Sequence, residues 1–274
     1  MQKILVTTDY SNNSKSGIRF AIQLAKKMHC ELVFYHVFEG ITNNNWNNDN
    51  TESEEHNLRI EKLKKFVTSV YKAHNLRLHK FTCIVETGID INNLIHNYAK
   101  NNNCDYIFIS TRGGGVLKKL LGNTTSWLIQ NSSIPLIVVP KNYRLKPIED
   151  VWYSSDLSNI KNELSMVQNF AKPFKANVHV YHYDYMIELE EVLNNLNKIA
   201  TKHITKGTYF HFRKMKIDKT ISEHLQSDMT KHKPSIVVLF TKQNKTWYDR
   251  LFLRNNTKEV SFDTKTPLLI LRKK

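Results

Sequence analysis

FAIQLAKKMHCELVFYHV, residues Phe20–Val37, recurs in altered form as QNFAKPFKANVHVYHY, residues Gln168–Tyr183. Within the two copies, Ala25–Lys26 matches Ala171–Lys172 at a separation of 146 positions. A period of this length lies far beyond the roughly 20–50 residues of solenoid repeats. It therefore indicates that a whole domain has been duplicated.

The similarity extends in both directions from this segment. Upstream, LVTTDYS (5–11) is echoed by WYSSDLS (152–158), which aligns Asp9 with Asp156. Downstream, IPLIVVP (134–140) is echoed by TPLLILR (266–272), which aligns Pro135 with Pro267 at a separation of only 132. The second copy is therefore shorter in its middle. We predict one domain over residues 1–146 and a second over residues 147–274.

Length and composition agree with two ordinary domains. At roughly 100–200 residues per domain, 274 residues suffice for two, and each can bury a core without disulfides. The three cysteines, Cys30, Cys83 and Cys104, form no CxxC pair, so we expect reduced thiols. No apolar run of about 18 residues and no signal-peptide layout are present, so we expect a cytoplasmic protein without membrane association.

The formal net charge of +15 raises the question of nucleic-acid binding, because basic surfaces attract polyanions. The excess of Lys and Arg is spread over both halves of the chain, without a basic arm or a recognisable nucleic-acid motif. A solvated basic surface is the interpretation that we favour, and a nucleic-acid partner is unlikely on this pattern.

Apolar runs alternate with amphipathic segments in both halves. Strands are expected at Lys3–Thr8, Glu31–Val37, Leu78–Val85, Tyr106–Ser110 and Leu136–Val139, and then at about Val151–Ser154, Asn177–Tyr183, Tyr209–Met215, Ile236–Phe240 and Leu268–Leu271. Helices are expected at Lys15–Met28, Glu52–Ala73 and Ile91–Lys100, from near Asn123, and at Ile221–Met229 and Thr257–Phe262, with an exposed loop at Thr42–Asn50. Continuously apolar strands between helices indicate a parallel sheet covered on both faces. Right-handed crossovers then give a doubly wound α/β sandwich.

Ligands of such sheets bind beyond the carboxyl ends of the strands. In the first half, Asp9, Val37 and the segment Ile109–Thr111 end strands one, two and four. The loop Thr111–Ser126 follows, with three consecutive glycines from Gly113, and its free amides at a helix start could hold an anion. A flexible turn explains these glycines equally well.

The opening KILVTTDYS, the Tyr35–Val37 strand end, the glycine loop and PLIVVP together resemble the universal stress protein family in its tandem-domain form. The resemblance covers essentially the whole chain. It implies two Rossmann-like domains of the adenine nucleotide alpha hydrolase type, each with a five-stranded parallel sheet in the order 3-2-1-4-5 and helices on both faces. One subgroup of the family binds ATP through a loop of the form G-x2-G-x9-G-[ST].

Carried over by position, the resemblance implies an ATP site, with Mg²⁺ as a possible companion, in the first domain. The base and ribose would lie near Thr7, Asp9, Val37 and Ile109, and the phosphates near Gly113, Gly122, Asn123 and Thr124, with Ser110 as a further candidate binding residue. The loop departs from the family pattern at three points: Ser110 replaces the first glycine, Gly113 and Gly122 enclose eight residues rather than nine, and Asn123 replaces Ser/Thr.

The second copy differs at the same places. Its loop Thr241–Glu259 has no glycine, and Arg254 aligns with Gly122, so we expect a degenerate domain that does not hold nucleotide in the family manner. Asp156 remains, but an Asp before a helix is more often an N-cap than a ligand, and the same alternative applies to Asp9. His36 and His182 are interpreted as facing the contact between domains or as satisfied core residues.

Three functions remain open at this point. The leading hypothesis is a nucleotide-responsive stress or regulatory protein and not a turnover enzyme, because no P-loop lysine motif is present. The alternatives are an interaction scaffold with both nucleotide sites defunct and a slow nucleotide hydrolase. A tandem can also supply within one chain the contact of a homodimer. We expect such a pseudo-dimer, with a further homodimer or an unidentified protein partner left open.

Overall fold

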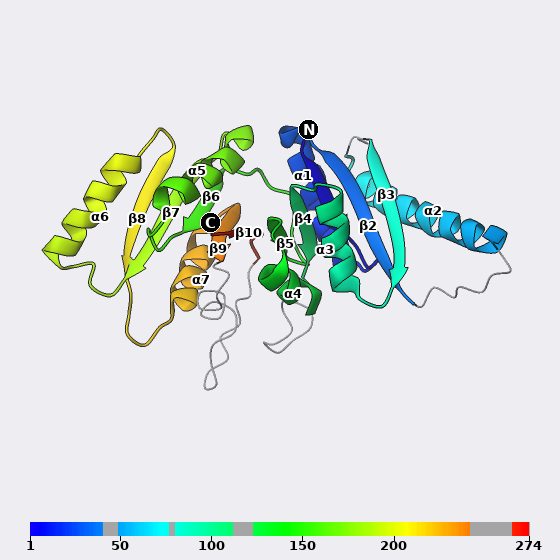
Figure 1. Ribbon diagram of the computed structural model, residues 1–274. Helices are drawn as coiled ribbons and strands as arrows, with labels where there is room; N and C mark the ends of the chain where they lie inside the picture. Colours follow the sequence, from blue (N-terminus) through cyan, green and yellow to red (C-terminus); the bar gives the residue numbers. More distant parts are fainter. Residues whose placement is uncertain (41–48, 77–79, 112–122, 242–264, 274) are drawn as a thin grey trace. The chain divides into compact units, whose positions relative to one another are not determined.

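A computed structural model of the chain describes residues 1–40, 49–76, 80–111, 123–241 and 265–273. The chain divides into two compact units, Met1–Leu145 (unit 1) and Lys146–Lys274 (unit 2), which Figure 1 draws in sequence colours. The segment from Gly113 to Gly122, the loop beyond Thr241 and the expected helix Thr257–Phe262 lie outside the described residues.

Unit 1 is a doubly wound α/β sandwich. Its elements are β1 (Lys3–Thr7), α1 (Ser14–Met28), β2 (Glu31–Glu39), α2 (Asp49–Ala73), β3 (Phe81–Gly88), α3 (Ile91–Asn101), β4 (Tyr106–Ser110), α4 (Asn123–Asn131) and β5 (Leu136–Val139). The strands pair in parallel in the order β3-β2-β1-β4-β5, as the resemblance implied. Helices α1 and α2 pack together on one face, and α3 and α4 on the other (Figure 1).

The core of unit 1 follows from the apolar pattern of the sequence. Strands β1, β4 and β5 are almost continuously buried, because helices cover both faces of the sheet. Helix α1 buries Ile18, Ala21, Ile22 and Ala25, which share one helical face. These contacts fix the carboxyl ends of β1 and β4 beside the first turn of α1.

Unit 2 repeats the same order of elements. They are β6 (Asp150–Ser154), α5 (Ile160–Ala171), the 3₁₀ turn η2 (Lys172–Phe174), β7 (Asn177–Asp184), α6 (Glu190–His203), β8 (Thr208–Lys214), α7 (Ile221–His232), β9 (Ile236–Thr241) and β10 (Leu268–Arg272). Its parallel strands follow the order β8-β7-β6-β9-β10, which is the order of unit 1 in its own numbering. The prediction of two like α/β domains is confirmed.

Some predicted boundaries were wrong. Strand β2 does not end at Val37, because Phe38 and Glu39 continue the ladder with β3. Helix α2 begins at Asp49, so the last two residues of the predicted loop are helical. Strand β3 begins at Phe81, since Lys80 before it is not in the strand, and the predicted start at Leu78 lies outside the described residues. These differences lie at element ends, where pairing with a neighbour decides how far an element extends.

Candidate functional site

The same turn follows the first strand of each unit. After β1, the Asp9 carboxylate accepts a hydrogen bond from the Ser11 amide at 3.0 Å. After β6, the Asp156 carboxylate accepts one from the Ser158 amide, also at 3.0 Å. The residue after each aspartate has a left-handed backbone, with φ of 60° and 62°. The domain duplication has therefore preserved this turn down to its hydrogen bonds.

Neither aspartate is the N-cap of the helix that follows. Asn13 occupies the N-cap position of α1, and Asn159 that of α5. The N-cap interpretation of Asp9 and Asp156 was wrong, because each carboxylate closes a separate turn before its helix begins.

A histidine from the neighbouring strand holds each turn. His36 Nδ1 donates to the Thr8 carbonyl at 2.7 Å, and His182 Nδ1 donates to the Ser155 carbonyl at 3.0 Å. Burial lowers the pKa of His36 and outweighs the opposing effect of the Thr8 hydrogen bond, which keeps this ring neutral at pH 7. Both histidines therefore have a structural role inside their own unit.

In unit 1, helix α1 approaches the end of β4 very closely. The Gly17 amide donates to Ser110 Oγ at 2.9 Å, and Ser110 Oγ donates to the Ser14 carbonyl at 3.4 Å. A Cβ atom at Gly17 would lie only 2.6 Å from Ser110 Oγ, well inside van der Waals contact. Small residues on both elements therefore permit this approach, and sequence reasoning missed the role of Gly17.

Most of the predicted site residues of unit 1 cluster at its strand ends. Thr7 is buried on β1 and donates through Oγ1 to the Phe108 carbonyl at 3.1 Å. Val37 and Ile109 are buried on the strands on either side of β1. The Asp9 side chain is exposed, and Ser110 is half-buried.

Among the remaining predicted residues, the structure describes only Asn123 and Thr124, and these two do not join the cluster. Asn123 and Thr124 open α4 and form no hydrogen bond to the strand ends within the described residues. Gly113 and Gly122 lie outside the described residues, so their predicted phosphate contacts stay predictions.

Aromatic rings and cations lie beside Asp9. The Tyr10 ring packs 4.4 Å from the His36 ring and 5.3 Å from the Phe66 ring. The Lys62 ammonium lies 5.2 Å from the centre of the Tyr10 ring, and the Lys15 ammonium lies 5.6 Å from that of Phe66. Burial raises the pKa of Tyr10 to about 12, so the phenol is neutral. The flank of this strand end therefore carries positive charge, which attracts anions.

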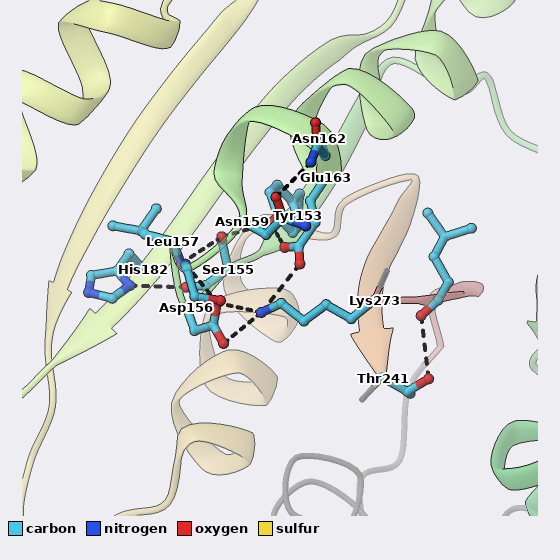
Figure 2. Close-up of polar contacts among 12 residues, drawn as sticks. Tyr153, Ser155, Asp156, Leu157, Asn159, Asn162, Glu163, His182, Thr241 and Lys273 are labelled. Carbon is cyan, nitrogen blue, oxygen red and sulfur yellow. Dashed lines mark hydrogen bonds and ion pairs between the residues drawn. The ribbon is translucent and has the colours of Figure 1, made fainter. Parts of the chain in front are cut away.

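Unit 2 fills the equivalent position with its own side chains, as Figure 2 shows. The Lys273 ammonium lies 2.6 and 2.7 Å from the two carboxylate oxygens of Asp156 and 3.3 Å from Glu163 Oε1. Glu163 Oε2 accepts a hydrogen bond from Tyr153 Oη, which itself accepts one from Ser155 Oγ at 2.8 Å. An ion-paired network therefore closes the end of β6.

The residues of this network differ between the units in an informative way. Lys273 follows TPLLILR as Lys141 follows IPLIVVP, so both units have the lysine. Glu163 stands 146 positions after Gly17, so unit 2 has a carboxylate where unit 1 has no side chain. The Lys141 ammonium forms no ion pair within the described residues. The match of PLIVVPK to PLLILRK could have revealed the lysine from sequence.

The electrostatics of unit 2 follow from burial and from this pairing. Burial alone would raise the pKa of Asp156, but hydrogen bonds from Lys273 and Ser158 outweigh it and lower the pKa below its usual value. Burial and the hydrogen bond to Glu163 raise the pKa of Tyr153 far above its usual value. The network is thus a lysine cation, anionic Asp156 and a neutral phenol around a buried carboxyl group.

A histidine pair lies elsewhere in unit 2, on strands β7 and β8. His179 Nε2 lies 3.1 Å from Asp150 Oδ1, and its Nδ1 lies 2.9 Å from His211 Nε2. Burial is the main cause that lowers the pKa of His211 to about 4. Nearby His179, Arg213 and His232 lower it further, and together they exceed the opposing effect of Asp228. The His211 ring is therefore neutral near pH 7.

No group of three or more His, Cys, Asp or Glu side chains that could hold a metal ion is present in the described part of the chain. Cys30, Cys83 and Cys104 are free thiols, as expected. Among the helices of the described residues, none is both long and apolar enough to cross a membrane.

These features define a protein of two Rossmann-like α/β units, each with a conserved turn at the carboxyl end of its first strand. Residues 1–140 match the model of the universal stress protein family, and the chain belongs to this family. No curated protein sequence matches the chain at a significant level.

Solved structures with the same fold match along almost the whole chain. A universal stress protein from Archaeoglobus fulgidus DSM 4304 is 15% identical, with a TM-score of 0.68 over 99% of this chain and 96% of that one. A functionally unknown protein, PA1789, from Pseudomonas aeruginosa PAO1 is 13% identical, with a TM-score of 0.60 over 99% and 92%. At these identities the similarity establishes the fold alone.

Proposed function

We propose that unit 1 binds an adenine nucleotide, with ATP as the first candidate, and that unit 2 does not. The chain then acts as a nucleotide-responsive stress or regulatory protein in which one unit senses the ligand. Membership of the universal stress protein family supports a regulatory role, and the difference between the two units supports the division of labour.

The observation that carries this proposal is the contrast between Gly17 and Glu163. In unit 2 the Glu163 carboxylate is buried at the strand end and would repel a phosphate, while Lys273 is held by Asp156. In unit 1 the corresponding residue adds no charge, and Lys15 and Lys62 lie beside the site. In unit 1 the exposed Asp9 carboxylate therefore lies at a strand end flanked by positive charge, whereas in unit 2 the equivalent Asp156 carboxylate is already paired with Lys273.

The residues of unit 1 suit the parts of a nucleotide as follows. Asp9 would accept hydrogen bonds from ribose hydroxyls, since a carboxylate accepts several. Val37 and Ile109 are apolar and lie near the ends of the strands on either side of β1, where the base would bind. The start of α4 at Asn123 would present amides to phosphate oxygens. A Mg²⁺ ion that accompanied the nucleotide would neutralise part of the phosphate charge.

A regulatory role, as opposed to turnover, is the second part of the proposal. Phosphoryl transfer needs positioned cations and a group that orients the nucleophile. The chain has no P-loop lysine motif to supply the first. Incubation of the purified protein with ATP and Mg²⁺ should release no phosphate beyond that of the Asp9→Ala variant.

The test of binding is thermal unfolding with and without ATP and Mg²⁺. Ligand at about 100 times its dissociation constant should stabilise unit 1 by roughly 2.7 kcal/mol, which raises the melting temperature by several degrees. Asp9→Ala should abolish this shift. Asp156→Ala is the matched control, because it removes the equivalent carboxylate of unit 2 and should leave the ATP-induced shift intact.

Titration calorimetry with ATP, ADP, AMP and cyclic AMP at millimolar concentrations completes the test. Absence of heat with all four, together with no thermal shift, would contradict nucleotide binding and favour the interaction scaffold. An equal loss of the shift in both Ala variants would show that the site is not confined to unit 1.

A further inference from the structure

We propose that the carboxyl end of β6 in unit 2 is a binding site for a primary ammonium group, which Lys273 fills in the folded chain. The site takes an external primary alkylammonium ion when the Lys273 side chain is removed. The same position of the fold therefore prefers a cation in unit 2, whereas the proposed ligand of unit 1 is an anion. This inference stands on the described geometry and does not require nucleotide binding.

The geometry around the Lys273 nitrogen is that of a built ammonium site. A primary ammonium carries three N–H donors. Three carboxylate oxygens surround it, Asp156 Oδ1 and Oδ2 at 2.6 and 2.7 Å and Glu163 Oε1 at 3.3 Å. The Lys273 side chain is only 10% exposed, so the ammonium and its stem are enclosed.

The buried oxygen of Glu163 independently indicates a cationic occupant. The Glu163 side chain is 3% exposed, and its Oε2 is satisfied by Tyr153. Its Oε1 has no hydrogen-bond partner in the described structure and is directed at the ammonium. A buried carboxylate oxygen needs a donor or a cation, because leaving it unpaired carries a large desolvation cost.

The charge and the donors of the site select among ligands. Two carboxyl groups face one ammonium, which disfavours phosphates and other anions. A quaternary ammonium has the same charge but no N–H group, so it cannot satisfy the three oxygens. Unit 1 provides a natural contrast, since Gly17 leaves it without the second carboxylate.

Chemical rescue of Lys273→Ala in the full chain tests the proposal. The substitution removes Cγ, Cδ, Cε and Nζ, which n-propylammonium replaces atom for atom. We expect the variant to melt several degrees below wild type. Melting is then compared in n-propylammonium chloride and in sodium chloride, each at about 0.1 M so that the ionic strength is the same. In the amine salt the variant should regain at least half of the lost melting temperature relative to sodium chloride. Tetramethylammonium chloride should recover none.

Two further variants serve as controls. Lys273→Met keeps the bulk of the stem and removes the charge, so it should be destabilised but insensitive to n-propylammonium, because methionine fills the space. Lys141→Ala removes the equivalent lysine of unit 1 and should show no amine-specific gain. If Lys273→Ala does not accumulate as folded protein, the soluble yield after refolding from urea in either salt provides the same comparison.

The proposal is overturned if n-propylammonium stabilises Lys273→Ala no more than sodium or tetramethylammonium does. Equal recovery in Lys141→Ala would also overturn it, since the effect would then be general. A larger recovery with Mg²⁺ or Ca²⁺ than with the amine would identify a divalent-cation site instead.

Discussion

The close approach of α1 to β4 in unit 1 makes Gly17→Ala informative in two backgrounds. In wild type the new Cβ would lie 2.6 Å from Ser110 Oγ, so either the helix shifts or the hydroxyl rotates out of its 2.9 Å hydrogen bond with the Gly17 amide. Overpacking of this kind costs about 1–3 kcal/mol. If the hydroxyl rotates away instead, the cost is that of the lost hydrogen bond, about 0.5–1.5 kcal/mol.

A gain opposes this cost. Alanine is favoured over glycine within a helix by about 1 kcal/mol. The net effect in wild type should therefore be a destabilisation of about 1 kcal/mol. In a Ser110→Ala background the nearest remaining atom, the Cβ of residue 110, lies at an ordinary contact distance of 3.8 Å. The same substitution should then stabilise unit 1 by about 0.5–1 kcal/mol, which reverses its sign.

Urea unfolding followed by circular dichroism gives the four free energies of this double-mutant cycle. Gly40→Ala is a control, because its Cβ would meet Thr87 at an unstrained 3.6 Å and should change stability little. Stabilisation of equal size in both backgrounds would refute the reasoning, since it would mean that residue 110 does not restrict residue 17.

Three further predictions concern unit 2. The pKa of Asp156 is lowered in the folded state, so this carboxylate should stabilise unit 2 fully above about pH 3.9 and lose that contribution as the pH falls further. The melting temperatures of wild type and Asp156→Asn should therefore converge in strong acid. His211, with a pKa of about 4, should destabilise unit 2 as the pH falls from about 6.5 towards 4, and His211→Asn should flatten that profile measured by melting temperature. Thr220→Ala removes the capping box at the start of α7 and should cost about 0.5–2 kcal/mol in urea unfolding, whereas Thr230→Ala, which loses only a bond to a helix carbonyl, should cost much less.

The sequence was sufficient to predict the two-domain α/β architecture, because strand and helix periodicities are local and the duplication provides a second copy for comparison. It also identified Asp9 and Asp156 as equivalent residues of interest. Their role was misjudged because a carboxylate a few residues before a helix can cap it or close its own turn. The choice depends on backbone angles that the pattern does not encode.

The pairing of Glu163 with Lys273 in unit 2 was beyond sequence reasoning for a different reason. Glu163 occupies an inward position of α5, and a single carboxylate there gives no hint of its partners. Its partner Lys273 lies 110 residues further along the chain, which is a separation that only the folded sheet closes. The role of Gly17 was equally hidden, since it depends on how closely α1 approaches Ser110.

The short connection between the two units is held at both ends. Tyr143 is buried in unit 1, with its ring 4.9 Å from Phe20 and its hydroxyl donating to Gln23 at 2.9 Å. Lys146 donates to the Pro234 carbonyl of unit 2 at 2.9 Å. A protein fragment designed to end at residue 140, where the family match ends, would therefore expose the Phe20 ring. Dividing the chain between Leu145 and Lys146 would keep Tyr143 with unit 1 and Lys146 with unit 2.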